Sequence, residues 1–428
     1  MKYVCLNNDK YLYAVDYNQI INTAIKGLFI KYGANTKIEW EDVRVDEKTI
    51  QAKVRQLKQV VFEVSQLCNL QCSYCVYGGS YYYHRKNSSK SLSFDTSRKV
   101  IDFFSEIFGK RLQKELTVGF YGGEPLINFD VIEKIVDYSK KVFPNWVLRF
   151  TITTNGTLLD DRMIHFLVKN NFSLMVSLDG NEKNHDSRRI FPDGSGSFHL
   201  IIENIEKIKN IDNEYYNERV SFIITYSNDL PIEDVFHFFL SDDRVRMNTV
   251  QFSPVNHLDT DYYDRYQYDK ATAATSISAA VNRITGKKIQ KIPLAPIEQD
   301  LFNQFADLDK KLKRRRLSFL SGSCLFDNRL YIDTDGAFHI CEKMNDRFPF
   351  GDCEKGFDFF KMNQITHAFM DLIKIKCLGC EARFLCSRCY IHFAKNGTFE
   401  MDPDFCVLNK KKIKKLEKLI QLKEKGVL

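Results

Sequence analysis

Apolar and polar positions follow two alternating patterns from about residue 59 to residue 255. Short, largely apolar runs of strand length recur as VVFEVSQ, ELTVGFYGG, VLRFTITTNG, FSLMVSLDG, RVSFIITYS and VRMNTVQFSPV. Between them, segments such as DVIEKIVDYSKKV and HLIIENIEKIKN repeat apolar residues every three or four positions, which predicts amphipathic helices. Strands that alternate with helices predict parallel strands with right-handed crossovers, and hence an α/β fold with a sheet or a partial barrel.

Polar motifs stand where four of these strands end. CNLQCSYC (68–75) follows the first strand, GGEP (122–125) the second, TNG (154–156) the third and SLDG (177–180) the fourth. In folds of this kind the chemistry lies at the carboxyl ends of the strands. We therefore expect the four motifs to meet in one site.

The remaining chain divides into four regions. Residues 1–58 form a preface, residues 256–317 a predicted helical bridge, and residues 318–410 a region that holds eight of the 12 cysteines. Residues 411–428 place apolar side chains at 413, 416, 419, 420 and 422 among lysines. This spacing predicts a terminal amphipathic helix with a basic outer face.

Composition narrows the class of protein. The 428 residues, 44% hydrophobic and 27% charged, suffice for one large α/β domain and a smaller one. No run of about 20 apolar residues is present, and the first residues lack the apolar core of a signal peptide. We therefore expect a cytoplasmic protein whose cysteines bind metal or do redox work rather than form disulfides. The net charge of +7 is mild, and we expect neither nucleic acid nor a membrane as a partner.

Cys68, Cys72 and Cys75 lie four and three residues apart, a spacing that predicts ligands to one inorganic centre. A structural zinc ion takes a fourth protein ligand, and the next cysteine along the chain is Cys324. A 4Fe-4S cluster held by three thiolates instead leaves one iron open to an exogenous ligand. The alternative is that these three are unrelated free thiols in one loop. We interpret the isolated Cys5 as a free thiol.

The pattern C-x3-C-x-aromatic-C, with Tyr74 as the aromatic residue, resembles the cysteine motif of the radical S-adenosylmethionine (SAM) enzymes. With GGEP, TNG and SLDG, the resemblance covers residues 59–255 and implies a partial (β/α)6 barrel similar to a TIM barrel. It implies that Cys68, Cys72 and Cys75 hold a 4Fe-4S cluster whose open iron is chelated by SAM. It further implies that one electron from the cluster cleaves SAM into methionine and a 5′-deoxyadenosyl radical.

The same resemblance implies a set of SAM contacts. Gly122 and Gly123 permit close backbone approach, and the carboxylate of Glu124 suits the ammonium group of SAM. Arg189 suits the SAM carboxylate, with Arg188 as its competitor. The remaining expected contacts are Tyr74, Asn155, and, for the ribose hydroxyls, Ser177 and Asp179.

Cysteines of the C-terminal region follow a second spacing. Cys324-x11-Gly336-x4-Cys341, CLGCEARFLCSRC at 377–389 and Cys406 resemble the SPASM extension, which carries two auxiliary 4Fe-4S clusters. The usual pattern has three residues, not two, before the cysteine that corresponds to Cys389. The resemblance implies an iron–sulfur domain whose first cluster is held by Cys324, Cys341 and Cys389, with Cys353 or substrate in the fourth place. It assigns the second cluster to Cys377, Cys380, Cys386 and Cys406, and a four-thiolate zinc site is the alternative for the central group.

The two resemblances together imply an enzyme that abstracts hydrogen from a ribosomally made precursor peptide and installs a thioether or carbon–carbon crosslink. The preface favours this function, because peptide maturases carry an N-terminal leader-binding segment. The implied partners are a precursor peptide with its leader, a reducing protein such as flavodoxin or ferredoxin, and a separate leader-binding protein.

Two other functions stay open. One is oxidation of a sulfatase cysteine or serine to formylglycine, and the other is a non-catalytic iron–sulfur or zinc-binding electron carrier. Glu342, directly after Cys341, is the candidate catalytic base, since an aspartate with that role follows an auxiliary-cluster cysteine in the sulfatase enzymes. A salt bridge from Glu342 to Lys343 or another cation is the alternative.

Overall fold

The computed structural model describes residues 3–6, 11–14, 19–22, 31–33, 39–41, 45–109, 114–227, 232–256, 258–266, 270–314, 316–320 and 324–427. Its central feature is an eight-stranded sheet with the strand order β11-β10-β9-β8-β7-β6-β13-β14. Six of its strands form the partial barrel: β6 (Gln59–Ser65), β7 (Glu115–Gly122), β8 (Val147–Thr154), β9 (Ser173–Ser177), β10 (Val220–Tyr226) and β11 (Thr249–Pro254). All neighbours among these six pair in parallel, as the alternating pattern predicts.

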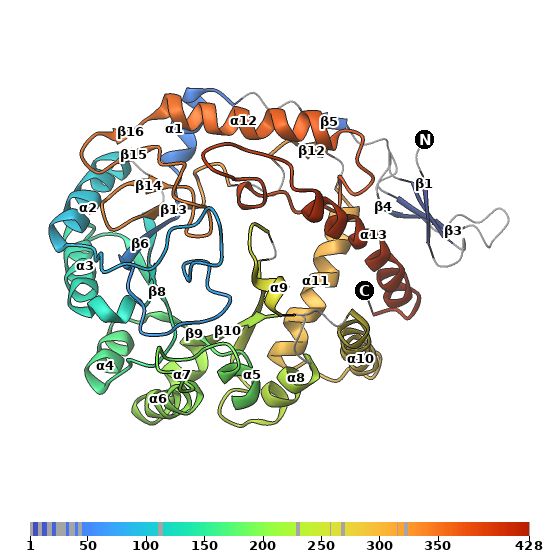
Figure 1. Cartoon of the computed structure of the whole chain (residues 1–428), viewed down its shortest axis with the longest axis horizontal. Helices are drawn as coiled ribbons and strands as arrows, with labels where there is room; N and C mark the ends of the chain where they lie inside the picture. The colour runs from blue at the N-terminus through green and yellow to red at the C-terminus, as the bar shows by residue number, and fades with distance from the viewer. Residues whose placement is uncertain are drawn as a thin grey trace.

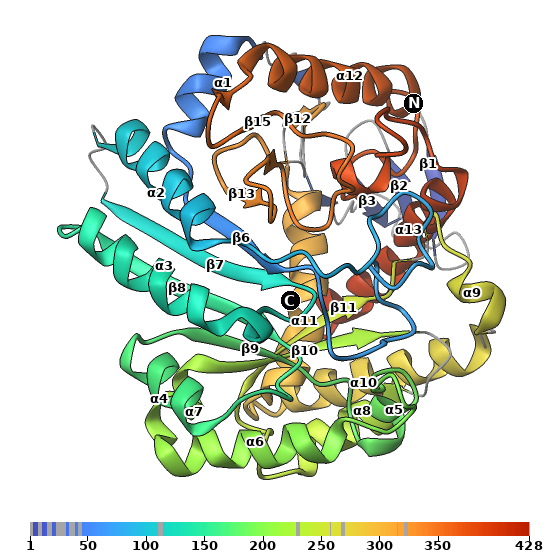
Figure 2. The same ribbon diagram turned by 60° about the vertical axis from the view of Figure 1, so that its left-hand side comes forward.

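Helices cover the outer face of this sheet and form an arc around it (Figure 1). Their apolar faces are buried against the strands, and a polar residue caps several of their first turns; the side chain of Ser93, for example, accepts from the backbone N–H of Thr96. Figure 2 shows the strands pointing toward the loop that follows β6, where the cysteine motif lies. The helices of this arc are α2 (Phe94–Phe108), α3 (Phe129–Val142), α4 (Asp161–Lys169), α5 (Glu182–Asp186), α6 (Phe198–Ile211), α7 (Asn213–Arg219) and α8 (Ile232–Ser241).

The cysteine-rich region extends the sheet, which the sequence did not predict. Strand β13 (Arg329–Ile332) pairs in parallel with β6, and β14 (Phe338–His339) pairs antiparallel with β13. β13 thereby occupies an edge of β6 that would otherwise be unpaired. The two parts of the chain thus share one sheet, and the short hairpin β15 (Gly351–Asp352) and β16 (Gly356–Phe357) follows.

The preface is divided among several neighbours. Strands β1 (Tyr3–Leu6), β2 (Tyr11–Ala14), β3 (Gln19–Asn22) and β4 (Lys31–Gly33) form their own antiparallel sheet, which lies beside α13 (Pro403–Glu424) in Figure 1. β5 (Glu39–Glu41) pairs with β12 (Arg316–Ser318), and α1 (Glu47–Val54) contacts α12 (Phe359–Cys377). The side chain of Cys5 and much of the segment 10–33 lie outside the described residues.

The region between β11 and β12 is helical and comprises α9 (Tyr262–Arg265), α10 (Lys270–Ile289) and α11 (Pro296–Leu312). The terminal helix is confirmed, and all five of its apolar positions, Ile413, Leu416, Leu419, Ile420 and Leu422, are buried. Each such burial stabilises the fold by about 1.5–3 kcal/mol. Within the described residues, no helix is both long and apolar enough to cross a membrane.

Candidate functional site

A cavity of about 390 Å³ opens at the carboxyl ends of the parallel strands. All four strand-end motifs contribute to its wall. The lining includes the three motif cysteines and the side chains or backbones of Tyr74, Gly122, Gly123, Thr154, Asn155, Ser177 and Arg189. The sequence-predicted motifs therefore meet in one place.

The loop of Cys68, Cys72 and Cys75 holds its thiols partly buried and close enough to influence one another. Burial raises the pKa of both Cys68 and Cys72 to about 12, and the Cys75 charge adds to the shift at each. The Arg189 guanidinium opposes this shift, with its Nη1 3.9 Å from the Cys72 sulfur. A cationic metal centre would favour the thiolates that burial disfavours, so this donor set suits an iron–sulfur cluster.

No three His, Cys, Asp or Glu side chains in the described ranges lie close enough together to hold a single metal ion. A zinc ion needs all its ligands at one atom. The thiolates of a cubane cluster each bind a different iron, so they stand further apart than the ligands of one ion.

Arg189 is held in place by two neighbours. Its Nε donates to the Asp179 carboxylate at 2.9 Å, and Tyr74 donates its hydroxyl to the same carboxylate oxygen. The Tyr74 ring also lies 5.4 Å from the guanidinium carbon of Arg189. Arg189 is buried yet lines the cavity, so its remaining guanidinium donors are available to an anionic group there.

Its competitor Arg188 points elsewhere. The Arg188 Nε donates to the Tyr262 hydroxyl at 3.1 Å, and its guanidinium lies 4.0 Å from the centre of the Tyr266 ring. Among the described residues that line the cavity, Arg188 is not found. The geometry therefore favours Arg189 for the carboxylate contact.

Asp179 and Glu124 hold protein groups rather than facing the cavity. Asp179 accepts from Arg189 and Tyr74 with one oxygen and from the Thr225 N–H at 2.8 Å with the other. Glu124 is fully buried and joins two motifs through its carboxylate. It accepts from the backbone of Leu126 and Asn155 and from the hydroxyl of Thr154. Neither side chain is among the described residues lining the cavity, and both carboxylates bind protein groups; their expected contacts with SAM stay predictions.

Both glycines of GGEP lie against the backbone that leads into the cysteine loop, so a side chain at either position would clash with it. A Cβ on Gly123 would lie 2.3 Å from the Leu67 carbonyl oxygen, and one on Gly122 would lie 2.2 Å from the carbonyl oxygen of Ser65. Gly122 also has a φ of 144°, in the region that favours glycine. The end of β7 can therefore lie directly against the loop that carries the thiols.

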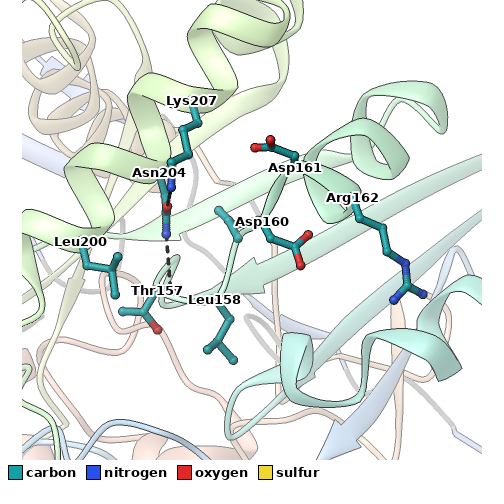
Figure 3. A pocket seen from close by; sticks show the side chains of 9 residues that line it. Thr157, Leu158, Asp160, Asp161, Arg162, Leu200, Asn204 and Lys207 are labelled. Carbon is teal, nitrogen blue, oxygen red and sulfur yellow. Dashed lines mark hydrogen bonds between the residues drawn. The ribbon is translucent and has the colours of Figure 1, made fainter.

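Asn155 links its own turn to the cysteine loop. Its Nδ2 donates to Asn69 Oδ1 at 2.9 Å and lies 3.9 Å from the Cys68 sulfur. Behind the turn, the buried Asn204 of α6 donates to the carbonyl oxygen of Thr157 (Figure 3). It also donates to the carbonyl oxygen of Gly156. Asn69 and Asn204 were missed from the sequence; Asn69 lies inside the cysteine motif, whereas nothing local distinguishes Asn204.

Glu342 lines the cavity from the C-terminal region. Its side chain is 6% exposed, and its Oε1 accepts from Arg329 Nη1 at 2.6 Å, so its cationic partner is Arg329. The hydroxyl of Tyr77, two residues after Cys75, donates to the backbone carbonyl of Glu342 at 2.8 Å. Lys343 and His392 line the same wall. Tyr77 also was missed, because its contact spans 265 residues of chain.

Seven of the eight C-terminal cysteines form two groups, and Cys353 belongs to neither. Cys377, Cys380, Cys386 and Cys406 line one small enclosed cavity together. In the other group, the pKa of the Cys341 thiol is raised by burial and by the charges of Cys389 and Cys324, among others.

Cys353 lies elsewhere, on the β15–β16 hairpin beside α2. A Cβ on Gly336 would meet both the Cys353 sulfur at 2.9 Å and the Thr96 side chain at 3.0 Å. Lys99 of α2 is the cation that acts on its thiol.

The chain carries a radical SAM domain: residues 62–239 match the family model described as the radical SAM superfamily. The radical SAM cyclopropyl synthase TigE of Paramaledivibacter caminithermalis is 28% identical over 245 residues, which cover 55% of this chain and 48% of the relative. The cysteine-type anaerobic sulfatase-maturating enzyme of Clostridium novyi is 27% identical over 204 residues, covering 47% of this chain and 52% of the relative. The chain spans about half the length of the curated relatives it matches.

Solved structures share the fold over a longer stretch. One, described as native anSMEcpe with bound AdoMet, has a TM-score of 0.62 at 17% sequence identity. The superposition covers 85% of this chain and 98% of the solved chain. At this identity the likeness concerns the fold alone. It confirms the predicted α/β partial barrel.

Replacing Arg189 with Ala is expected to weaken SAM binding roughly ten- to hundredfold, since a charge-assisted contact is worth about 1.5–3 kcal/mol. Arg188→Ala is the matched control and should leave the SAM dissociation constant unchanged, because Arg188 faces Tyr262. Binding is measured by anaerobic calorimetry on reconstituted protein with iron content and melting temperature matched to wild type. Equal dissociation constants for Arg189→Ala and wild type would remove Arg189 from the carboxylate contact.

Proposed function

We propose that this protein is a radical SAM maturase that installs a crosslink in a ribosomally made precursor peptide. The observation that carries the proposal is that two parts of the chain build one cavity. The radical SAM domain contributes the three-cysteine loop, and the cysteine-rich region contributes Glu342, Lys343 and His392. A substrate bound there contacts both regions.

The radical SAM domain supplies the cofactor site. Cys68, Cys72 and Cys75 hold a 4Fe-4S cluster with one open iron, and with SAM bound there the site supplies a 5′-deoxyadenosyl radical. Arg189 binds the SAM carboxylate, while Asp179 and Tyr74 orient its guanidinium. Asn155 and Ser177 line the cavity and serve the rest of SAM; Gly122 and Gly123 let the cysteine loop close against β7.

The cysteine-rich region is a SPASM-type domain with two auxiliary 4Fe-4S clusters. Cys377, Cys380, Cys386 and Cys406 hold the second of these clusters, in the enclosed cavity that they share. Cys324, Cys341 and Cys389 hold the first. Because Cys353 lies on the β15–β16 hairpin beside α2, the fourth place of the first cluster falls to substrate.

The chemistry of a thioether crosslink fits this arrangement. Forming a C–S bond from a C–H and an S–H group removes one hydrogen atom, one proton and one electron from the peptide. With SAM bound, the site would supply the radical that accepts the hydrogen atom, and Glu342, at the cavity wall, would accept the thiol proton. The electron requires a one-electron acceptor, and the C-terminal cysteines are the residues that would hold it. The same balance applies to a carbon–carbon crosslink.

Formylglycine formation is the second candidate function. It is favoured by the 27% identity with the cysteine-type anaerobic sulfatase-maturating enzyme over 47% of this chain and by Glu342 directly after Cys341. It would use the same cavity and the same base. It differs in the product, because the cysteine sulfur leaves the peptide.

The remaining parts of the proposal concern partners and organisation. A flavodoxin or ferredoxin delivers the electron for SAM cleavage in the cytoplasm. The sheet of β1–β4 receives the leader of the precursor peptide, alone or with a separate leader-binding protein. The proposed organisation is a leader segment at residues 1–58, the barrel at 59–255, a helical bridge at 256–317, the auxiliary-cluster domain at 318–410 and the terminal helix at 411–428.

The test follows the product by mass. Anaerobically reconstituted protein with dithionite and SAM is expected to form 5′-deoxyadenosine. Co-expression with each small open reading frame beside its gene should yield a peptide lighter by two hydrogen atoms per crosslink, located by fragmentation. As the control, the Kp18Cys peptide, which is bound in a solved structure of anSMEcpe, should remain unchanged. Loss of sulfur from Kp18Cys would instead establish the formylglycine reaction, and absence of deoxyadenosine would favour an electron carrier.

A further inference from the structure

His185 is a fully buried side chain at the end of α5, outside the four strand-end motifs. Its Nδ1 accepts the backbone N–H of Asp179 at 3.2 Å, and its Nε2 lies 3.0 Å from the hydroxyl of Ser197. Because a backbone N–H can only donate, Nδ1 carries no proton and Nε2–H donates to Ser197. Burial and the charge of Arg189 hold the pKa of His185 well below its usual value, in agreement with a neutral imidazole.

Ser197 extends this contact to the peptide group of Arg189. The Ser197 hydroxyl donates to the Arg189 carbonyl oxygen at 2.8 Å, while its lone pairs accept from His185. Ser197 is itself held by Asp186, whose Oδ1 accepts the Ser197 backbone N–H at 2.9 Å. We call His185 and Ser197 the imidazole–hydroxyl pair. It joins the SLDG turn at Asp179 to the backbone of Arg189 through hydrogen bonds that each have a defined direction.

The segment around Arg189 is also bound to the cysteine loop. The backbone N–H of Gln71 donates to the Ile190 carbonyl oxygen at 2.8 Å. The N–H of Ser73 donates to the Arg188 carbonyl oxygen at 3.0 Å. The backbone of Arg189 is therefore fixed between the cysteine loop and the imidazole–hydroxyl pair, and its guanidinium reaches the cavity from there.

We propose that the imidazole–hydroxyl pair positions Arg189 for SAM, by fixing the backbone from which the guanidinium reaches the SAM carboxylate. The inference rests on the proposed contact between Arg189 and that carboxylate. Neither His185 nor Ser197 is among the described residues that line the cavity, so their effect on SAM passes through Arg189. A long side chain loses rotamer freedom when it binds, and supporting hydrogen bonds reduce that loss by holding it in the productive geometry.

Ser197→Ala removes the hydroxyl with a small change in volume. It is expected to raise the SAM dissociation constant about three- to tenfold, which is less than for Arg189→Ala, because a hydrogen bond between uncharged groups is weaker than a charge-assisted one. Binding is measured by anaerobic calorimetry on the reconstituted full-length chain at wild-type iron content. An unchanged dissociation constant in Ser197→Ala would overturn the proposal.

Ser97→Ala is the matched control for a purely structural effect. Ser97 is also fully buried, in the first turn of α2, and its hydroxyl also donates to a backbone carbonyl, that of Phe94 at 2.7 Å. Both serine variants should lower the melting temperature, and only Ser197→Ala should weaken SAM binding. An equal loss of affinity in Ser97→Ala would reduce the role of Ser197 to general stability and would contradict the proposal.

A double-mutant cycle tests whether Ser197 acts through Arg189. In the Arg189→Ala chain, the further change Ser197→Ala should leave the SAM dissociation constant where Arg189→Ala alone puts it. If the two losses multiply instead, Ser197 acts by another route and the inference fails. The Arg189→Ala variant by itself reports on the proposed carboxylate contact. Wild-type affinity in Arg189→Ala would overturn that contact and this inference with it, whereas an effect of Arg189→Ala without one of Ser197→Ala would overturn this inference alone.

Two replacements of His185 decide the question even if Ser197→Ala fails to fold. Glutamine places its amide nitrogen near the position of Nε2 and can still donate to Ser197, whereas asparagine places its amide oxygen near Nδ1 and can only accept from Asp179. His185→Gln should therefore bind SAM more tightly than His185→Asn. Equal affinities, or the reverse order, would show that the contact with Ser197 does not position Arg189.

Discussion

The combined Cys68→Ala, Cys72→Ala and Cys75→Ala variant is expected to lose reductive cleavage of SAM completely while it keeps two of three clusters. These three thiols line the cavity that also holds Arg189, and no other cysteine contributes to that wall among the described residues. The iron content should fall from about 12 to about eight per chain, since each 4Fe-4S cluster holds four. Iron analysis and chromatographic detection of 5′-deoxyadenosine with dithionite measure the two effects.

Cys353→Ala is the matched control for this loss of thiols. Cys353 lies on the β15–β16 hairpin beside α2, so its variant should retain all clusters and normal SAM cleavage. Loss of iron from Cys353→Ala would make it a ligand of the first auxiliary cluster after all. Deoxyadenosine formation by the triple variant would refute the assignment of the SAM-binding cluster.

The parallel half-barrel could be predicted from the sequence because its signals are local. Each strand is a short apolar run, and each helix repeats apolar residues at helical spacing, so both patterns can be recognised without knowing the partners. The same holds for α13, where five apolar positions predicted the buried face. The cysteine spacings are equally local, which is why the motif at 68–75 could be recognised before any contact was known.

Pairings between distant segments could not be predicted in this way. β13 joins β6 across about 270 residues of chain, and a short strand carries no signal that selects its neighbour. The contact of Tyr77 with Glu342 depends on that arrangement. The preface, residues 1–58, contacts α12, α13 and β12 with different parts of its length. Its sequence predicts only one segment, because no local pattern indicates these distant partners.

The hydrogen-bond partners of the site residues could not be predicted from the sequence. Glu124 and Asp179 stand in the expected motifs, and their carboxylates accept hydrogen bonds from protein groups that no motif indicates. A sequence motif marks where a polar residue stands, not which of several donors it meets. Asn204 shows the converse, since a buried side chain far along the chain stabilises the TNG turn without belonging to any motif.

The Cys377→Ala/Cys380→Ala variant is expected to separate SAM cleavage from peptide modification. Both thiols lie in the enclosed cavity with Cys386 and Cys406, apart from the cavity that the motif cysteines line. SAM cleavage depends on the motif cysteines, so 5′-deoxyadenosine should still form at a rate comparable to wild type. Under the proposed function, crosslinked peptide should fall below detection by mass spectrometry, because the second auxiliary cluster would no longer be there to accept an electron from the substrate.

Folding must be kept apart from electron transfer in this test, because a metal cluster also stabilises the domain that binds it. Cys380 packs against the apolar core that includes residues of the N-terminal sheet and of α13, so its loss also removes packing. Cys377→Ser/Cys380→Ser serves as a second variant of closer size, and both are compared with wild type by thermal melting. Retained deoxyadenosine formation itself reports an intact SAM site. A well-folded variant that lacks the second auxiliary cluster yet crosslinks its peptide at the normal rate would contradict this division of labour, and the electron would then have to leave through the group of Cys324, Cys341 and Cys389.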